Sequence, residues 1–203
     1  MANYGSPERE NAAARCGLTL ADVSASAKLE IQGRDVSEIA RALLGDGAGT
    51  RIGSVSSIDL GGPTLACRPT TSRLLLLGSM PNAAPLHERV RSVRGIDRVI
   101  LNDVTNAYAA FSLSGPTFES LLRRLTAIDV SSSVFAEGSC AETNLAGVEA
   151  LLVRPPTCSR PRILIRVGWD VGEYLWETLV HTGSGLDLTT IAPSANEFSA
   201  GSP

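Results

Sequence analysis

Two aspartates stand among residue types that could support acid–base chemistry. Asp22 and Asp103 each precede a valine and then a hydroxyl-bearing residue, Ser24 or Thr105. A carboxylate can serve as a general base when burial raises its pKa toward neutrality. An aspartate at a strand entrance also fixes a turn, because its side chain accepts a hydrogen bond from the backbone two residues on. We expect the turn-forming role at both positions and assign no catalytic residue.

Histidines and cysteines are the other candidate groups. His87 and His181 stand apart from each other, so a histidine relay or a histidine metal site has little to draw on. The four cysteines form no Cys-x-x-Cys pair and are expected to be reduced and structural: Cys16, Cys67, Cys140 and Cys158. Without a neighbouring histidine or basic cluster, Cys140 should keep a near-normal pKa and stay unreactive. We therefore predict no metal site.

Each aspartate opens a strand–turn–helix unit, and the two units repeat. In residues 103–125, alternating apolar residues, a Gly-Pro turn and apolar positions every three to four residues predict a strand, a turn and a helix. Gly33 and Gly115 lie 82 positions apart (115 − 33), and Leu43 and Leu125 are separated equally (125 − 43). One register therefore aligns the strand, turn and helix of the two units, which indicates two related halves.

Further elements surround these units. Apolar alternation and turn residues predict strands, a hairpin with a tight turn at Ala146-Gly147, and a last helix. The predicted ranges are strands at 54–60, 64–68, 73–77 and 162–167, the hairpin at 141–153 and the helix at 171–183. Because strands and helices mix without regular βαβ alternation, we expect an α+β fold.

Composition narrows the functional class. The net charge of −3 over 203 residues creates no field that would attract nucleic acid. We find no stretch of about 18 apolar residues and no signal-peptide core, so we expect a cytoplasmic protein without membrane contact. The expected organisation is a flexible N-terminal tail (1–17), a first half (18–98), a second half (99–184) and a flexible C-terminal tail (185–203).

Taken together, the sequence resembles the aminomethyltransferase (glycine-cleavage T-protein) superfamily, and most of all the gamma subunit of heterotetrameric sarcosine oxidase. Asp22 to Asp35 is similar to the T-protein D-V-S, strand and G-P-D turn, and Leu113 to Pro116 to its L-x-G-P. Glu137 to Thr143, Leu145 to Val148 and Tyr174 to Trp176 are typical of the gamma subunit. The resemblance implies a truncated aminomethyltransferase-like fold that lacks the C-terminal domain.

Two departures from the T-protein pattern concern its folate site. Where the resemblance places paired aspartates after a double glycine, this chain reads Gly61-Gly62-Pro63-Thr64-Leu65-Ala66. Where it places a Gly-Tyr-Thr-Gly-Glu-type loop, after Arg154, this chain reads Pro155-Pro156-Thr157-Cys158. We expect that the folate site is lost.

The resemblance implies a non-catalytic gamma-type subunit of a complex that oxidatively demethylates sarcosine or a related N-methyl amine and passes the one-carbon unit to tetrahydrofolate. It implies alpha, beta and delta partner subunits that carry FAD, FMN, NAD and tetrahydrofolate, with no cofactor in this chain. Trp169, Tyr174 and Trp176 are candidate interface residues, since aromatics dominate interface energetics, although Trp176 could also lie in the core. The alternative is a free-standing tetrahydrofolate-binding aminomethyltransferase-like enzyme.

Overall fold

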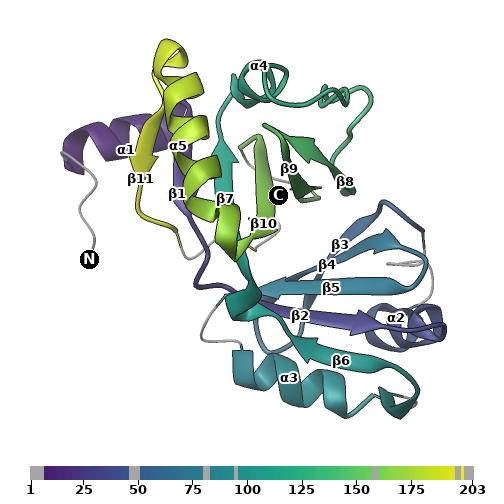
Figure 1. Cartoon of the computed structure of the whole chain (residues 1–203). Coiled ribbons are helices and arrows are strands. Elements are labelled where there is room, and N and C mark those ends of the chain that lie inside the picture. The colour runs from purple at the N-terminus through teal and green to yellow at the C-terminus, as the bar shows by residue number, and fades with distance from the viewer. Residues whose placement is uncertain are drawn as a thin grey trace.

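The computed structural model describes residues 7–45, 51–79, 83–93, 96–156, 160–194 and 198. Within these ranges the chain forms two β-sheets that pack face to face, with helices on their outer sides (Figure 1). Sheet A has the strand order β11-β1-β7-β10-β9-β8, and sheet B the order β3-β4-β5-β2-β6. The expected α+β class and most of the expected strands are confirmed.

Sheet B and two helices form the lower layers in Figure 1. Its strands are β2 (Ala27–Gln32), β3 (Val55–Asp59), β4 (Pro63–Thr70), β5 (Arg73–Gly78) and β6 (Ile100–Asp103). The central leucine-rich strand β5 buries Leu74 and Leu76 under the helices and Leu75 and Leu77 toward sheet A. The covering helices are α2 (Val36–Leu44) and α3 (Ala83–Arg91). A strand buried on both faces explains the continuous apolar run.

Sheet A carries the other helices. Its strands are β1 (Thr19–Asp22), β7 (Tyr108–Ser114), β8 (Ser139–Leu145), β9 (Val148–Arg154), β10 (Arg162–Gly168) and β11 (Thr189–Ile191). The helices α4 (Phe118–Leu122) and α5 (Gly172–Gly183) bury Phe118, Leu175 and Leu179 against its outer face. Helix α4 ends earlier than the apolar spacing through Leu125 predicts, because residues 123–125 form a turn.

The two halves exchange their first strands. Strand β1, from the first half, pairs antiparallel with β7 in sheet A, and β6, from the second half, pairs antiparallel with β2 in sheet B. A boundary near residue 98 divides the sequence repeat, but it does not divide the sheets. The repeat is therefore a feature of the sequence, whereas each sheet draws strands from both halves.

Both expected tails contain regular structure. Residues Pro7–Cys16 form helix α1, which an Ala-rich segment favours, and the Arg160 guanidinium donates to the Ala13 carbonyl (3.1 Å) and to the Gly17 carbonyl. Strand β11 lies parallel to β1, with Thr189 opposite Thr19. Parts of both expected tails therefore carry regular structure that hydrogen bonds join to the rest of the chain. Residues 1–6, 195–197 and 199–203 lie outside the described residues.

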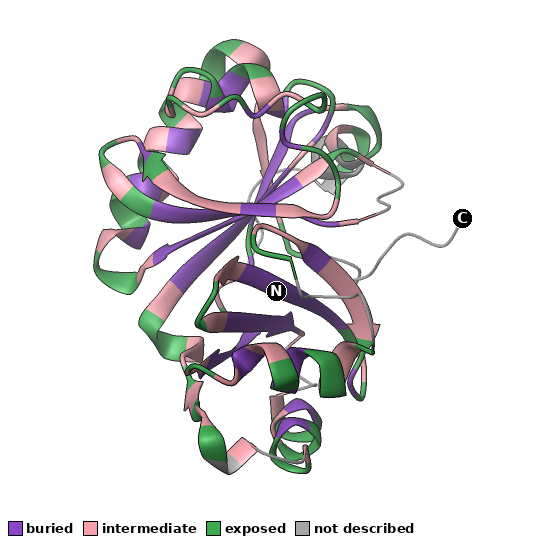
Figure 2. Cartoon of the chain, turned by 90° about the vertical axis from the view of Figure 1, so that its right-hand side faces the viewer, coloured by how far each residue is buried: buried purple, intermediate pink, exposed green. Residues whose placement is uncertain are grey.

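The space between the sheets is mainly apolar. Buried residues follow the strands of both sheets, and exposed residues lie on the outer sides of the helices (Figure 2). The inter-sheet cluster comprises Val23, Val55, Leu65, Cys67, Leu75, Leu77, Ala110, Cys140, Leu151, Val153, Leu164 and Phe198. This cluster joins the two sheets into one packed body.

Candidate functional site

The two predicted aspartates form turns. The Asp22 carboxylate accepts a hydrogen bond from the Ser24 N–H (2.9 Å), and the Asp103 carboxylate accepts one from the Thr105 N–H (3.0 Å). The Thr105 backbone N–H, followed by its hydroxyl, lowers the pKa of Asp103. A carboxylate with a lowered pKa is a weak base. The expected structural role of both aspartates is confirmed.

These turns hold the point where the chain crosses between the sheets, which we call the crossover. Four hydrogen bonds join the two units there in two matching pairs: Val23 N–H to the Ala110 carbonyl (2.9 Å), Val104 N–H to the Lys28 carbonyl (2.9 Å), Ala110 N–H to the Ser24 hydroxyl (3.0 Å) and Lys28 N–H to the Thr105 hydroxyl (3.1 Å). Each unit therefore donates one N–H to a carbonyl and one N–H to a hydroxyl of the other unit. The hydroxyls of Ser24 and Thr105, two residues after each aspartate, therefore also have a structural role.

Lys28 breaks this symmetry. Its side chain is fully buried, and Nζ donates to the carbonyls of Ser24 (2.7 Å), Ser26 (2.9 Å) and Thr105 (3.3 Å). Burial lowers the pKa of Lys28 to about 8. The matching position of the second unit holds Ala110. Lys28 was not among the predicted site residues, although it is the only lysine of the chain and stands inside an apolar strand.

A polar cavity of about 570 Å³ lies between the sheets, beside the apolar cluster, and we call it the inter-sheet cavity. Arg73 bridges two of its carboxylates, with Nη1 2.7 Å from Glu142 and Nη2 3.0 Å from Glu30. Burial alone would lower the pKa of Arg73, but Glu30 and Glu142 outweigh it and raise the pKa. Arg73 is therefore a fully used cation that fastens β5 to β8.

Arg166 lies in the same cavity but is poorly paired. The side chain is 6% exposed and lies 3.8 Å from the centroid of the Tyr108 ring. Its Nη2 is 3.9 Å from the Glu142 carboxylate, beyond hydrogen-bond distance. Its Nε and Nη1 meet no hydrogen-bond partner in the part of the chain that the structure describes. The sequence shows Arg166 only as one polar residue in an alternating strand, so its burial was not predictable.

A second cavity, of about 520 Å³, brings two of the predicted aromatic residues together, and we call it the aromatic cavity. Trp169 is 64% exposed, and Trp176 packs on Phe111 with ring centroids 5.4 Å apart. The acidic residues along this cavity are Asp22, Asp170 and Glu173. Trp176 thus serves the chain's own core in part, as the sequence left open.

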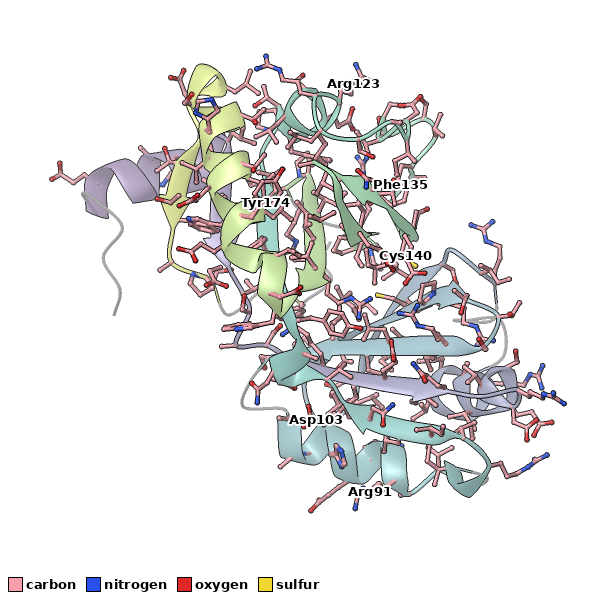
Figure 3. The ribbon with its side chains drawn as sticks, viewed as in Figure 1. Arg91, Asp103, Arg123, Phe135, Cys140 and Tyr174 are labelled. Carbon is pink, nitrogen blue, oxygen red and sulfur yellow. The ribbon has the colours of Figure 1, made fainter. Side chains whose placement is uncertain are left out.

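The third predicted aromatic, Tyr174, points elsewhere. It is 50% exposed on α5, and its hydroxyl donates to the Ala146 carbonyl (2.8 Å) in the β8–β9 turn. In Figure 3, Tyr174 lies on α5, Asp103 beside the crossover and Cys140 between the two sheets. Trp169 and Tyr174 both belong to the outer side of sheet A.

The described cysteines are free thiols. Burial raises the pKa of Cys140 to about 12 and the pKa of Cys67 well above its ordinary value, and both lie in the inter-sheet cluster. The prediction of a near-normal pKa for Cys140 is wrong because the thiol is buried, yet the expected lack of reactivity follows all the more. Cys16 is exposed. Cys158 lies outside the described residues.

The double-glycine turn leads into the core and not toward a carboxylate site. Asp59 accepts hydrogen bonds from the N–H groups of Gly61 (3.0 Å) and Gly62 (2.8 Å), which fixes the turn. Leu65 and Ala66, which follow, are fully buried. Leu65 faces the inter-sheet cluster, and Ala66 faces the cluster under the helices of sheet B.

Neither a metal cluster nor a membrane helix is found among the described residues. They contain no group of three or more histidine, cysteine, aspartate and glutamate side chains that could hold a metal ion. None of the helices in the described ranges has the length and apolar character needed to cross a membrane.

Comparison with known proteins identifies relatives in sequence and in fold. No protein-family model matches the chain. An aminomethyltransferase of Streptomyces avermitilis is 23% identical over an alignment of 209 positions, which covers 96% of this chain and 54% of that protein. The chain therefore spans about half the length of the curated relative that it matches.

Two solved structures share the fold. A chain of heterotetrameric sarcosine oxidase from Corynebacterium sp. U-96, in complex with pyrrole 2-carboxylate, superposes with a TM-score of 0.70 at 21% identity, covering 86% of this chain and 88% of that one. The glycine cleavage system aminomethyltransferase T from Bartonella henselae gives a TM-score of 0.69 at 16% identity, covering 90% of this chain and 50% of that one. The chain has the aminomethyltransferase-like fold that the sequence indicates.

Proposed function

We propose that this chain is a non-catalytic, gamma-type subunit of a cytoplasmic heterotetrameric complex of the sarcosine oxidase type. In this proposal the complex oxidatively demethylates sarcosine or a related N-methyl amine and transfers the one-carbon unit to tetrahydrofolate. The alpha, beta and delta subunits hold FAD, FMN, NAD and tetrahydrofolate. This chain packs against them and holds none of these groups.

The observation that carries the proposal is the extent of the structural match. The fold matches 88% of a chain in a heterotetrameric sarcosine oxidase but only half of an aminomethyltransferase. The first of these chains belongs to a heterotetrameric complex. A match over nearly all of that chain supports the subunit role.

The interior of the chain supports a structural role. Leu65 and Leu75 fill the space between the sheets together with Cys67 and Cys140. A pterin ring with its polar edges would leave hydrogen-bonding groups unpaired against such a surface, which is costly. Since the cluster is closely packed, it stabilises the contact between the sheets and leaves little reason to assign folate binding to it.

The exposed aromatics support a partner surface on the α5 side. Trp169 is exposed beside the aromatic cavity, and Tyr174, on α5, is half exposed outside that cavity. Tryptophan is among the residue types enriched at the energetic centres of interfaces. Three carboxylates along the cavity favour a partner segment that carries a basic side chain.

Titration with tetrahydrofolate tests the proposal against the free-standing enzyme. The chain would be purified alone and, separately, together with flavin-binding subunits encoded beside it, and heat of binding would be measured for each. We expect the chain alone to give no heat and the complex to bind tetrahydrofolate. Saturable binding by the chain alone, with aminomethyl transfer, would instead support the alternative enzyme.

A further inference from the structure

Arg166 presents two hydrogen-bond donors that the described protein leaves unused. Arg166 is only 6% exposed, yet its Nε and Nη1 have no hydrogen-bond partner among the described residues. Leaving buried donors unpaired is costly, and more so for charged groups than for neutral ones. Native proteins pair such groups with protein, water or ligand. Nε and Nη1 have almost no exposed surface of their own, so a partner in the inter-sheet cavity, which Arg166 lines, would reach them after a small in-plane shift of the guanidinium.

The guanidinium is held in place without being neutralised. It stacks on Tyr108 at 3.8 Å from the ring centroid, which fixes its plane. Glu142, the nearest carboxylate in an ion pair with it, is already bound to Arg73 at 2.7 Å and lies 3.9 Å from Arg166. A planar, preorganised and unsatisfied guanidinium is the side chain that best recognises a carboxylate.

The rest of the cavity favours positive charge. Glu149 and Asp170 line it and are exposed at the surface, and neither forms an ion pair with a described residue. A simple anion would meet these carboxylates on its way to Arg166. A ligand that carries both a carboxylate and an ammonium group would satisfy both ends. The volume of about 570 Å³ lies in the range of about 300–1,000 Å³ found for small-molecule sites.

We propose that the inter-sheet cavity binds a small amino acid, with its carboxylate on the guanidinium of Arg166 and its ammonium group toward Glu149 and Asp170. Gly168 lies between Arg166 and Asp170 in the sequence. Its lack of a side chain makes room for the Asp170 carboxylate, because a Cβ at Gly168 would lie 2.6 Å from a carboxylate oxygen of Asp170. The inter-sheet cavity and the aromatic cavity share Asp170, but their other lining residues differ. It does not depend on the proposed complex, so either can fail without the other.

The first test compares three probes on the full-length chain: glycine, acetate and methylammonium, at equal millimolar concentration and ionic strength. We expect glycine to raise the unfolding temperature and to give saturable heat, and acetate and methylammonium to act weakly. Equal effects of glycine and acetate would overturn the proposal. A glycine-soaked crystal with only water on Arg166 would overturn it as well.

The second test removes the donors. Arg166→Met keeps an unbranched apolar stem and removes the guanidinium, and replacing a buried charge by an apolar residue is often tolerated. We expect glycine affinity to fall by at least about tenfold, the loss expected for one charge-assisted hydrogen bond. Unchanged glycine affinity in a folded R166M protein would overturn the proposal.

A third test needs no change in the interior and so covers the case in which R166M does not fold. The variant E149Q/D170N removes two exposed carboxylates of the cavity, and E177Q/D187N is its control, with the same change in net charge at exposed residues elsewhere on the chain. We expect E149Q/D170N to weaken glycine and strengthen acetate, whereas the control changes neither. The same response from both variants would contradict the assigned role of the acidic residues.

Discussion

Lys28 is the residue at which the repeated scaffold becomes asymmetric. Its Nζ closes the crossover by donating to three carbonyls, one of them from the other half. Burial lowers its pKa from 10.5 to about 8, so the folded state binds the proton less readily than the unfolded chain does. Stability from this group therefore increases with pH between about 8 and 10.5, where the unfolded chain binds more protons.

Comparing the wild-type chain with Lys28→Met measures this effect. We expect the free energy of unfolding of the wild type, relative to K28M, to rise across pH 8 to 10.5. Other groups titrate in this window, but they do so in both proteins. Urea unfolding at several pH values gives the difference, and a pH-independent difference would mean that the pKa of Lys28 is ordinary.

The turn at Asp103 should matter more than an equivalent turn elsewhere. Asp129 makes the same contact, accepting the Ser131 N–H at 2.9 Å, but away from the crossover. We expect Asp103→Ala to cost about 1–2 kcal/mol, because it also releases the Thr105 hydroxyl that binds the Lys28 N–H. Thermal unfolding should show a smaller loss for Asp129→Ala, and equal losses would argue against a special crossover.

Sequence pattern identified some of these residues and not others. The Asp-x-Ser and Asp-x-Thr turns were predictable because their hydrogen bonds are local. The burial of Lys28 and Arg166 was not, because it depends on strands that pair across distances of dozens of residues. The pKa of Cys140 was misjudged for the same reason, since neighbouring residues in sequence do not reveal burial.

At the scale of elements, the strand–turn–helix units were predictable and their pairing was not. Periodicity identified strands and the helix α5, whereas the exchange of β1 and β6 between sheets needs the hydrogen bonds of the crossover. The ordered segments α1 and β11 lacked any strong pattern, since docking on distant residues stabilises them. Edge elements of this kind are the least visible in a single sequence.

Gly115 follows β7 and permits a close approach to the residues just before β1. Its φ is 126°, and a Cβ there would lie 2.3 Å from the Gly17 carbonyl oxygen, next to β1. Gly147 has φ 88° with nothing within 4 Å of its Cβ position, so it is the matched control. We expect Gly147→Ala to cost about 1 kcal/mol from strain alone, and Gly115→Ala to cost about 3 kcal/mol or more. Denaturant unfolding of both variants checks this, and equal costs would show that the approach at Gly115 relaxes easily.

At the scale of the whole molecule, the chain is two sheets joined by an apolar interface, with aromatic residues left on one outer side. The fold followed from the resemblance in sequence, and its match to both solved structures confirms that. The partner surface remains a prediction, because a single chain shows exposure but not what covers it. Trp169 is the residue through which that prediction can be tested.

Substituting Trp169 should affect assembly and not folding. Because Trp169 is 64% exposed, we expect Trp169→Ala to leave thermal stability unchanged. We expect it to weaken binding to the partner subunits by about 30-fold, the loss for an interface residue worth about 2 kcal/mol. Val134→Ala, at a position that is 66% exposed on the α4–β8 connection, is the control and should not affect assembly. Surface plasmon resonance with the partner subunits measures both, and equal affinities would remove Trp169 from the interface.

The most direct test of the subunit role is native mass spectrometry of the tagged chain, co-expressed with the flavin-binding subunits encoded beside it. We predict one copy of this chain in a flavin-containing heterotetramer that oxidises an N-methyl amine. A chain that purifies as a monomer from the same cells, without flavoprotein partners and with tetrahydrofolate bound, would contradict the account.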